Sequence, residues 1–152
     1  MNAATNDRNT ALILAAQHGH VGCLQLLLDA KADMHVQRGD GHSALAIAVA
    51  KDLTVIIPLR LEALLGATAT VDKKNKQGKT PLMVAAYHSS HGAVKKLISA
   101  KANVNSCDER GDTALILAAR HGSTSIVKTL LSAKVNVKAR DKQGKIALYW
   151  AL

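Results

Sequence analysis

A segment of eleven residues recurs along this chain at a nearly fixed interval. It begins at Thr10 as TALILAAQHGH and returns at Thr113 as TALILAARHGS, with the first seven residues identical. Related segments start at Ser43, Thr80 and Ile146, so the successive intervals are 33, 37, 33 and 33 residues. A period of this length predicts a solenoid, in which each unit buries its apolar face against its neighbours rather than in one central core.

A second motif supports this register. Each later segment is preceded, eleven residues upstream, by a short motif that follows a leucine-rich stretch: Ala32-Asp33-Met34, Ala69-Thr70-Val71, Ala102-Asn103-Val104 and Val135-Asn136-Val137. Both motifs keep their spacing on either side of the 37-residue interval. Its four extra residues are therefore expected between Ala48 and Leu64.

The composition favours thin helices that pack closely. The 152 residues are 48% apolar, yet they include no Phe, one Trp and two Tyr. Single globular cores usually contain several aromatic side chains. Here the core must come from Ala, Leu, Ile and Val at repeating positions, as in a stack of short helices.

Each unit reads as a helical hairpin. A hydroxyl residue precedes each apolar segment, where it can cap exposed backbone N–H groups, and Pro81 follows its cap at a position that tolerates proline. An alanine pair such as Ala15-Ala16 leaves room for a neighbouring helix. A Gly turn then leads to a second helix with leucines at helical spacing, and polar turn residues connect successive units.

Together these motifs resemble the ankyrin repeat. The resemblance rests on T-P-L-x-x-A-A, the Gly-His turn, the Leu-Leu pair and A-D/N-V-N, and it covers essentially the whole chain. It implies an all-α solenoid of stacked helix-turn-helix units joined by β-hairpin-like loops. In that register one domain spans 1–152, with repeats at 5–37, 38–74, 75–107 and 108–140 and a partial repeat at 141–152.

Two departures from the family pattern carry structural expectations. The family's usual His after T-P-L is replaced by Ile13, Ala46, Met83, Ile116 and Tyr149, so apolar contacts are expected where that His would form hydrogen bonds. The family's usual Gly after the second helix is replaced by Lys31, Thr68, Lys101 and Lys134. A non-Gly residue with positive φ costs on the order of 1 kcal/mol, only partly offset by a cation at a helix C-terminus.

No motif for catalysis or for a cofactor is found. Gly78-Lys79-Thr80 resembles the end of a phosphate-binding loop, but Lys73 stands where that motif requires Gly. His18, His88 and His121 share one slot in successive units, and the spacing of stacked layers predicts a ladder rather than a metal site. Cys23, expected in the second-helix core, and Cys107, expected in a loop, have no partner spacing and are predicted to be free thiols. We expect a chain that is not an enzyme and has no cofactor or metal.

The exposed slots point to a protein partner. In such a stack, the loop tips and the last turn of each first helix line a continuous concave face. The predicted partner-binding residues on this face are His18, Lys51, Lys76, Lys79, Tyr87, His88, Arg110, Arg120 and His121. The groove floor carries Lys51, Arg120 and three imidazoles without any acid, which predicts an acidic partner with Tyr87 as its aromatic anchor.

Two other functions remain open. A structural spacer in a longer array would show no charge bias in these slots. Nucleic-acid binding would fit the net charge of +9, but acids at Asp108, Glu109 and Asp112 interrupt the basic residues, and no aromatic set for base stacking is present. The polar N-terminus and the lack of an apolar run of about 20 residues predict a cytoplasmic location without membrane insertion, and the basic loop 73–79 gives the nucleus as the alternative.

The C-terminal end and the longer second unit carry the last expectations. The partial fifth unit leaves the apolar side of the fourth without a complete partner and gives Tyr149 and Trp150 little to pack on. A fragment of a longer array or self-association through this end is predicted. The extra residues before Pro58 are expected to lengthen the turn inside the second unit, with Val55 to Ile57 as extra core or as a partner patch.

Overall fold

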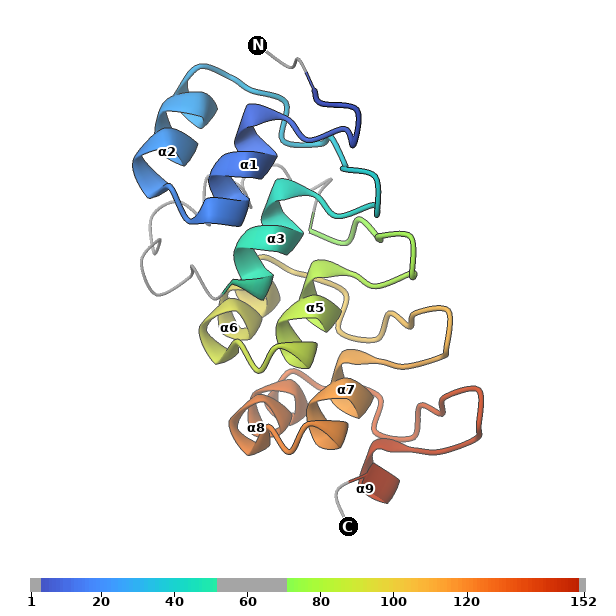
Figure 1. Ribbon diagram of the computed structural model, residues 1–152. Coiled ribbons are helices and arrows are strands. Elements are labelled where there is room, and N and C mark those ends of the chain that lie inside the picture. The colour runs from blue at the N-terminus through green and yellow to red at the C-terminus, as the bar shows by residue number, and fades with distance from the viewer. Residues whose placement is uncertain (1–3, 52–70, 151–152) are drawn as a thin grey trace.

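The chain forms a stack of helical hairpins. The computed structural model describes residues 4–51 and 71–150. Within these ranges it contains eight helices and no strand: α1 (Ala11–His18), α2 (Val21–Asp29), α3 (Ala44–Ala50), α5 (Pro81–Tyr87), α6 (His91–Ser99), α7 (Ala114–Arg120), α8 (Thr124–Ser132) and α9 (Ala147–Trp150). Helices α1, α3, α5, α7 and α9 stack in one column, α2, α6 and α8 lie beside it, and the loops project on the other side (Figure 1). This arrangement confirms the predicted all-α solenoid.

The first helix of each complete hairpin begins at a capped hydroxyl residue, as predicted. The side chains of Thr10, Ser43, Thr80 and Thr113 accept the backbone N–H three residues on, at 3.3, 3.3, 3.4 and 3.3 Å. Pro81 is the first residue of α5, where its missing N–H has no helical partner to lose. The Thr80 N–H also donates to Met83 Sδ at 3.4 Å, so the two residues form a reciprocal capping box at the start of α5.

The core runs along the column of first helices. Each contacts the next, from α1 to α3, α5, α7 and α9. The alanine pairs of α1, α5 and α7 are buried at these contacts and allow the close approach. Ile13, Ala46, Met83 and Ile116 are buried where the family would place His, so apolar packing takes over that position as expected. Tyr149 differs, because it is exposed.

The second helices end in the conformation that the sequence predicted. Lys31, Lys101 and Lys134 have φ of 58°, 66° and 56°, in the left-handed region that favours glycine. Thr68, the fourth residue of this slot, lies outside the described residues. The predicted insertion between Ala48 and Leu64, including Pro58 and the Val55 to Ile57 patch, also falls largely outside them.

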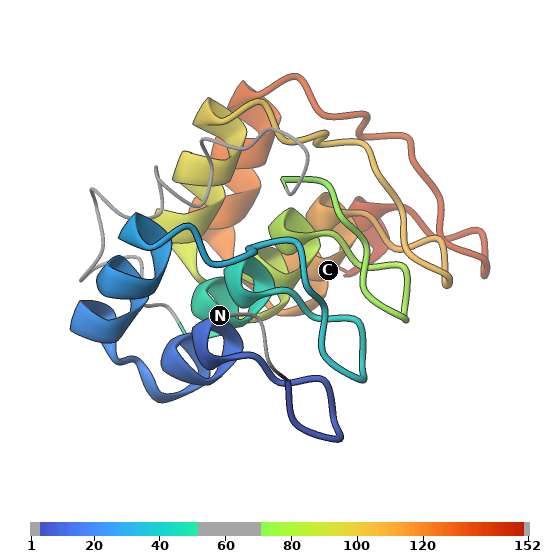
Figure 2. The same ribbon diagram turned by 90° about the horizontal axis from the view of Figure 1, so that it is seen from above.

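A ladder of hydrogen bonds joins the projecting loops. The N–H groups of Gly39, Lys76, Glu109 and Lys142 donate to carbonyls of the preceding loop at 2.9, 3.2, 3.2 and 2.9 Å. Inside the loops, the side-chain oxygens of Asn75, Asp108 and Asp141 each accept two backbone N–H groups. Isolated antiparallel bridges such as Gln37 with Ser43 close the loop bases, which confirms their hairpin-like form. In Figure 2 the loops project at an angle to the helices.

The two ends of the stack differ from the sequence-based expectations at two residues. Cys23 is exposed rather than buried in the core, because no described helix packs against that side of α1 and α2. Trp150 is half-buried and packs against the main core, and the Arg120 guanidinium lies 4.4 Å from its ring centroid. The expectation that Trp150 has little to pack on is therefore wrong.

Candidate partner-binding groove

A cavity lies in the angle between the loops and α5. Its volume is about 460 Å³, and it is lined by the end of α5 and by the loops on either side: His42, Gln77, Lys79, Val84, Tyr87, His88, Asp108, Glu109 and Arg110. Four of the predicted partner-binding residues meet here, namely Lys79, Tyr87, His88 and Arg110. We call this cavity the central groove.

Tyr87 is the aromatic centre of the central groove. It is the last residue of α5 and is 43% exposed. The Lys79 ammonium lies 4.5 Å from its ring centroid, within cation–π range. His88 and His121 approach it edge to face, with ring centroids at 5.1 and 4.7 Å. The Tyr87 ring is thus held by its neighbours and still offers exposed surface to a ligand.

His88 is less basic than an ordinary histidine. Its pKa is lowered, first because partial burial disfavours the charged imidazole and then because Lys79, His121 and His42 repel a second positive charge. The His88 imidazole is therefore neutral at neutral pH. A carboxylate placed among these groups would reverse the repulsion and favour protonation.

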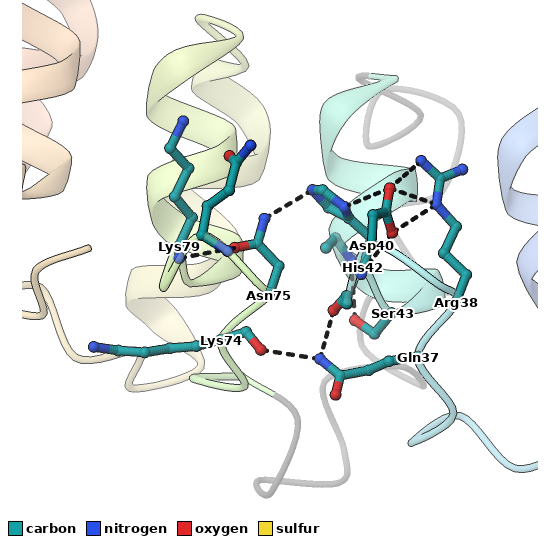
Figure 3. Close-up of polar contacts among 11 residues, drawn as sticks. Gln37, Arg38, Asp40, His42, Ser43, Lys74, Asn75 and Lys79 are labelled. Carbon is teal, nitrogen blue, oxygen red and sulfur yellow. Dashed lines mark hydrogen bonds and ion pairs between the residues drawn. The ribbon is translucent and has the colours of Figure 1, made fainter. Parts of the chain in front are cut away.

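The position of Lys79 depends on a polar network between two loops (Figure 3). Asn75 Oδ1 accepts the N–H groups of Gln77 and Lys79 at 3.0 and 2.9 Å, and Asn75 Nδ2 faces His42 Nε2 at 3.0 Å. An amide nitrogen only donates, so His42 accepts at Nε2 and carries its proton on Nδ1. His42 Nδ1 in turn lies 3.1 Å from Asp40 Oδ2.

Asp40 anchors the other side of this network. The Arg38 guanidinium forms charge-assisted hydrogen bonds with both of its carboxylate oxygens. These bonds, helped by the N–H and ring of His42, hold the pKa of Asp40 well below its usual range. The loop of the second hairpin has Arg38 where the later loops have Asn75, Asp108 and Asp141. Because Arg38 has no side-chain oxygen, Asp40 takes over the role of acceptor in this loop, and its Oδ1 accepts the His42 N–H at 3.0 Å.

Arg120 does not present a free charge to the groove. Its two terminal nitrogens donate to both carboxylate oxygens of Asp112 at 2.9 and 2.8 Å, and one of them lies 3.9 Å from Asp141. Asp112 is only 2% exposed. The predicted acid-free floor is therefore wrong, because this carboxylate comes from the loop before α7 and neutralises Arg120. Arg120 belongs to the joint between α7 and α9 more than to the partner surface.

The remaining predicted residues lie at different places. His121 is exposed beside Tyr87 and extends the central groove toward α7. Lys51 caps the C-terminal end of α3 and is exposed. Lys76 lines a separate cavity of about 460 Å³ between the first loops, and His18 stacks on His20 at 5.8 Å at the α1 end. The expected histidine ladder is thus interrupted, because Lys51 occupies its slot between His18 and His88.

Sequence reasoning left several groove residues out of the predicted site. The further lining residues are His42, Gln77, Val84, Asp108 and Glu109, and none of them was among the predicted partner-binding residues. The signal for His42, Asp108 and Glu109 was their position one loop before or after Lys79, whereas Gln77 lies in the same loop as Lys79 and Val84 lies in α5. Stacked loops place such positions side by side. Among the described residues, no three His, Cys, Asp or Glu side chains gather so that they could hold a metal ion.

Comparison with protein families agrees with the architecture. A family model described as ankyrin repeats in three copies matches residues 1–59 and 87–152. The matched ranges cover more than half of the chain and include both Tyr87 and His121. Within the part of the chain that the structure describes, no helix is long and apolar enough to span a bilayer.

Proposed function

Because the chain belongs to the ankyrin repeat family, whose members generally act as non-enzymatic protein–protein interaction modules, we propose that its central groove binds an acidic segment of a partner protein. The observation that carries this proposal is the exposed ring of Tyr87 beside the Lys79 ammonium, at the mouth of a cavity of about 460 Å³. Exposed aromatic and basic side chains of this kind are common anchors in protein interfaces.

The charges of the groove favour a carboxylate next to Lys79. Asp108 is buried and accepts two backbone N–H groups of its own loop, so its charge is already compensated. Glu109 is the exposed acid of the lining, which also contains the cations Lys79 and Arg110. An acidic ligand would approach the two cations and would be repelled by Glu109. Substitutions of Lys79 and of Glu109 should therefore change the affinity for an acidic ligand in opposite directions.

Charge variants on the two sides of the groove are expected to change affinity in opposite directions. Peptides are first selected from a displayed random library on the intact chain, and their affinity is then measured by fluorescence anisotropy. We expect enrichment of Asp and Glu. Lys79→Gln should weaken binding about two- to fivefold and Glu109→Gln should tighten it by a similar factor, while Tyr87→Ala should weaken it at least about tenfold.

The same measurements separate the proposal from its rivals. If Glu109→Gln weakens and Lys79→Gln tightens binding, the ligand is basic and the proposal is wrong. Selection of no peptide above background would instead favour a structural spacer. An oligonucleotide that binds as tightly as the selected peptides, and equally well to Tyr87→Ala, would favour nucleic-acid binding. Lys95→Glu on the outer helix α6 serves as the charge control and is expected to leave peptide affinity unchanged.

Peptide affinity is expected to rise as the pH falls below about 6.5, the ordinary pKa of histidine. The pKa of His88 is lowered in the free chain, so protonation there is delayed to more acidic solution. A bound carboxylate stabilises the imidazolium, so binding takes up a proton and tightens with acidification until the peptide acids themselves protonate near about 4.3. His88→Gln should flatten part of this rise. Affinity that is constant from neutral to mildly acidic pH would contradict a carboxylate at this position.

A further inference from the structure

A second cavity, of about 460 Å³, lies among the first three loops and shares no lining residue with the central groove. We call it the loop cavity. One acid, Asp33, lines it together with five cationic side chains, which are Arg8, Arg38, Lys73, Lys74 and Lys76. The lining is therefore strongly basic.

Two of these five cations are engaged elsewhere. The Arg38 guanidinium is paired with Asp40, so its charge is compensated. The Lys74 ammonium donates to the Cys107 carbonyl of the following loop at 2.8 Å. Figure 3 shows the Lys74 side chain extending away from Gln37. Neither Arg38 nor Lys74 therefore offers a free charge to a ligand in the loop cavity.

The other three cations keep their charge. The Lys73 ammonium donates to the carbonyl of His35, a lining residue, at 2.7 Å, and this neutral acceptor does not cancel the charge. Arg8 and Lys76 are exposed. No ion pair among the described residues involves any of the three. Asp33, the acid of the lining, accepts the His35 N–H at 2.8 Å. The loop cavity thus has more positive charge than a single carboxylate balances.

Arg8 occupies a position that is glycine in every later loop. Its φ is 60°, in the left-handed region, and the matching residues, also with positive φ, are Gly41, Gly78, Gly111 and Gly144. Arginine bears strain in this conformation that glycine avoids. Strained backbone of this kind is concentrated at ligand-binding positions. The first loop therefore gains a guanidinium at the loop cavity at the expense of backbone strain.

Gly39 completes an exchange at this joint. In the later loops its slot holds a side chain, at Lys76, Glu109 and Lys142. The Gly39 N–H donates to the Asp7 carbonyl at 2.9 Å, and an added Cβ would meet only that oxygen within 4 Å, at 3.5 Å. The later joints thus place glycine on the preceding loop and a side chain on the following one, whereas this joint does the reverse. The exchange leaves open space on the loop that follows Arg8.

The two loops behind the loop cavity are fixed to each other. Gln37 Nε2 donates to the Lys74 carbonyl at 3.0 Å, as drawn in Figure 3. The Lys76 N–H donates to the Asp40 carbonyl at 3.2 Å. These bonds hold the backbone of the basic loop in place before a ligand binds, which lowers the entropy that binding costs.

We propose that the loop cavity binds the phosphoryl group of a phosphorylated serine or threonine in a partner protein. Such a group carries a charge of about −1.5 to −2 at pH 7 and three acceptor oxygens, which suit Arg8, Lys73 and Lys76. The lining has no Tyr, Trp or Phe on which a base could stack, and none of the exposed large apolar side chains that a bilayer would bind. The family's general role in protein interactions favours a protein as the carrier of the phosphoryl group.

Fluorescence anisotropy with labelled peptides tests this proposal on the intact chain. A library with one fixed phosphoserine between random residues is selected on the wild type, and the best peptide is compared with versions that carry Ser or Glu at that position. Both versions should bind at least about tenfold more weakly. Arg8→Gln, Lys73→Gln and Lys76→Gln should each weaken phosphopeptide binding about three- to tenfold. Lys74→Gln, the matched control in the same loop, should change it by less than about twofold.

Arg8→Gly separates binding from stability. It restores the residue of the later loops, so the melting temperature should stay the same or rise, while phosphopeptide affinity falls as in Arg8→Gln. Tyr87→Ala should bind the phosphopeptide like the wild type, because Tyr87 lines the central groove and not the loop cavity. This proposal and the binding of an acidic segment in the central groove can therefore fail separately.

Several results would overturn the phosphoryl site. Equal affinity for the phosphoserine and Glu peptides, or no phosphopeptide selected above the Ser library, would show that the cavity does not recognise phosphate. A loss with Lys74→Gln as large as with Lys73→Gln would point to unspecific attraction by the basic loop. Inorganic phosphate that binds as tightly as the peptide would make the free anion the ligand. Tighter binding of an RNA oligonucleotide, or of vesicles that contain a phosphoinositide, would assign the cavity to that partner instead.

Discussion

Replacing Arg120 with Met is expected to lower the free energy of unfolding by about 2–3 kcal/mol. The change removes both hydrogen bonds to Asp112 and leaves that carboxylate buried without its partner, with Asp141 nearby. It also removes the cation from the Trp150 ring. The value lies below the range for a fully buried pair, because the Arg120 side chain is partly exposed. Denaturant unfolding followed by circular dichroism measures it.

Two further variants show whether the loss comes from the ion pair. Lys51→Met removes an exposed cation at the end of α3 and should change stability by less than about 0.5 kcal/mol. Adding Asp112→Asn to Arg120→Met should recover part of the loss, since the buried charge disappears with its partner. An Arg120→Met protein as stable as the wild type would show that Arg120 is a solvated surface residue, as the sequence alone suggested.

Gly41→Ala is expected to destabilise the joint between the second and third loops by about 2–4 kcal/mol. Gly41 has φ of 83°, and an added Cβ would lie 2.5 Å from the backbone nitrogen of Lys76. Gly111→Ala should behave similarly, with a contact of 2.9 Å to the nitrogen of Lys142. These nitrogens donate to the Asp40 and Arg110 carbonyls, so a shift that relieves the clash also breaks the ladder between loops.

Gly144→Ala is the matched control for this prediction. Gly144 has φ of 77°, but nothing lies within 4 Å of its added Cβ. It should cost only the backbone strain of about 1–2 kcal/mol that Lys31, Lys101 and Lys134 already bear. Equal losses for Gly41→Ala and Gly144→Ala in thermal melting would mean that the close approach of the loops contributes nothing.

The sequence predicted the architecture because its evidence is local and repeated. Caps, alanine pairs and glycine turns act within a few residues, and their recurrence fixes how hairpins stack. The positive φ at Lys101 followed from the same register. Cys23 was misplaced because its slot is buried only where another hairpin packs on that side, as it does at Ile126. No described helix covers that side of the first hairpin, so Cys23 is exposed there. Slot identity predicts burial only where both neighbours are present.

The candidate site was predicted less well, because a list of charges does not show which charges are paired. Arg120 and Lys51 looked equivalent on the groove floor, yet the carboxylate of Asp112, eight residues before Arg120, neutralises only one of them. Lys79 and Tyr87 are also eight residues apart, and there the helix and its preceding loop bring them together as the slots implied. The pairing depends on side-chain length and direction, which the repeat pattern does not specify.

Chemical-shift mapping with a selected acidic peptide tests the central claim most directly. The peptide is titrated into the isotope-labelled chain at a concentration too low for association, and backbone amide shifts are followed. If the central groove binds it, the largest changes should fall at Gln77 to Lys79, at Tyr87 and His88, and at His121. They should disappear in Tyr87→Ala. Changes concentrated on the outer helices α2, α6 and α8, or on the loop cavity beside Lys76, would contradict the groove as the binding site.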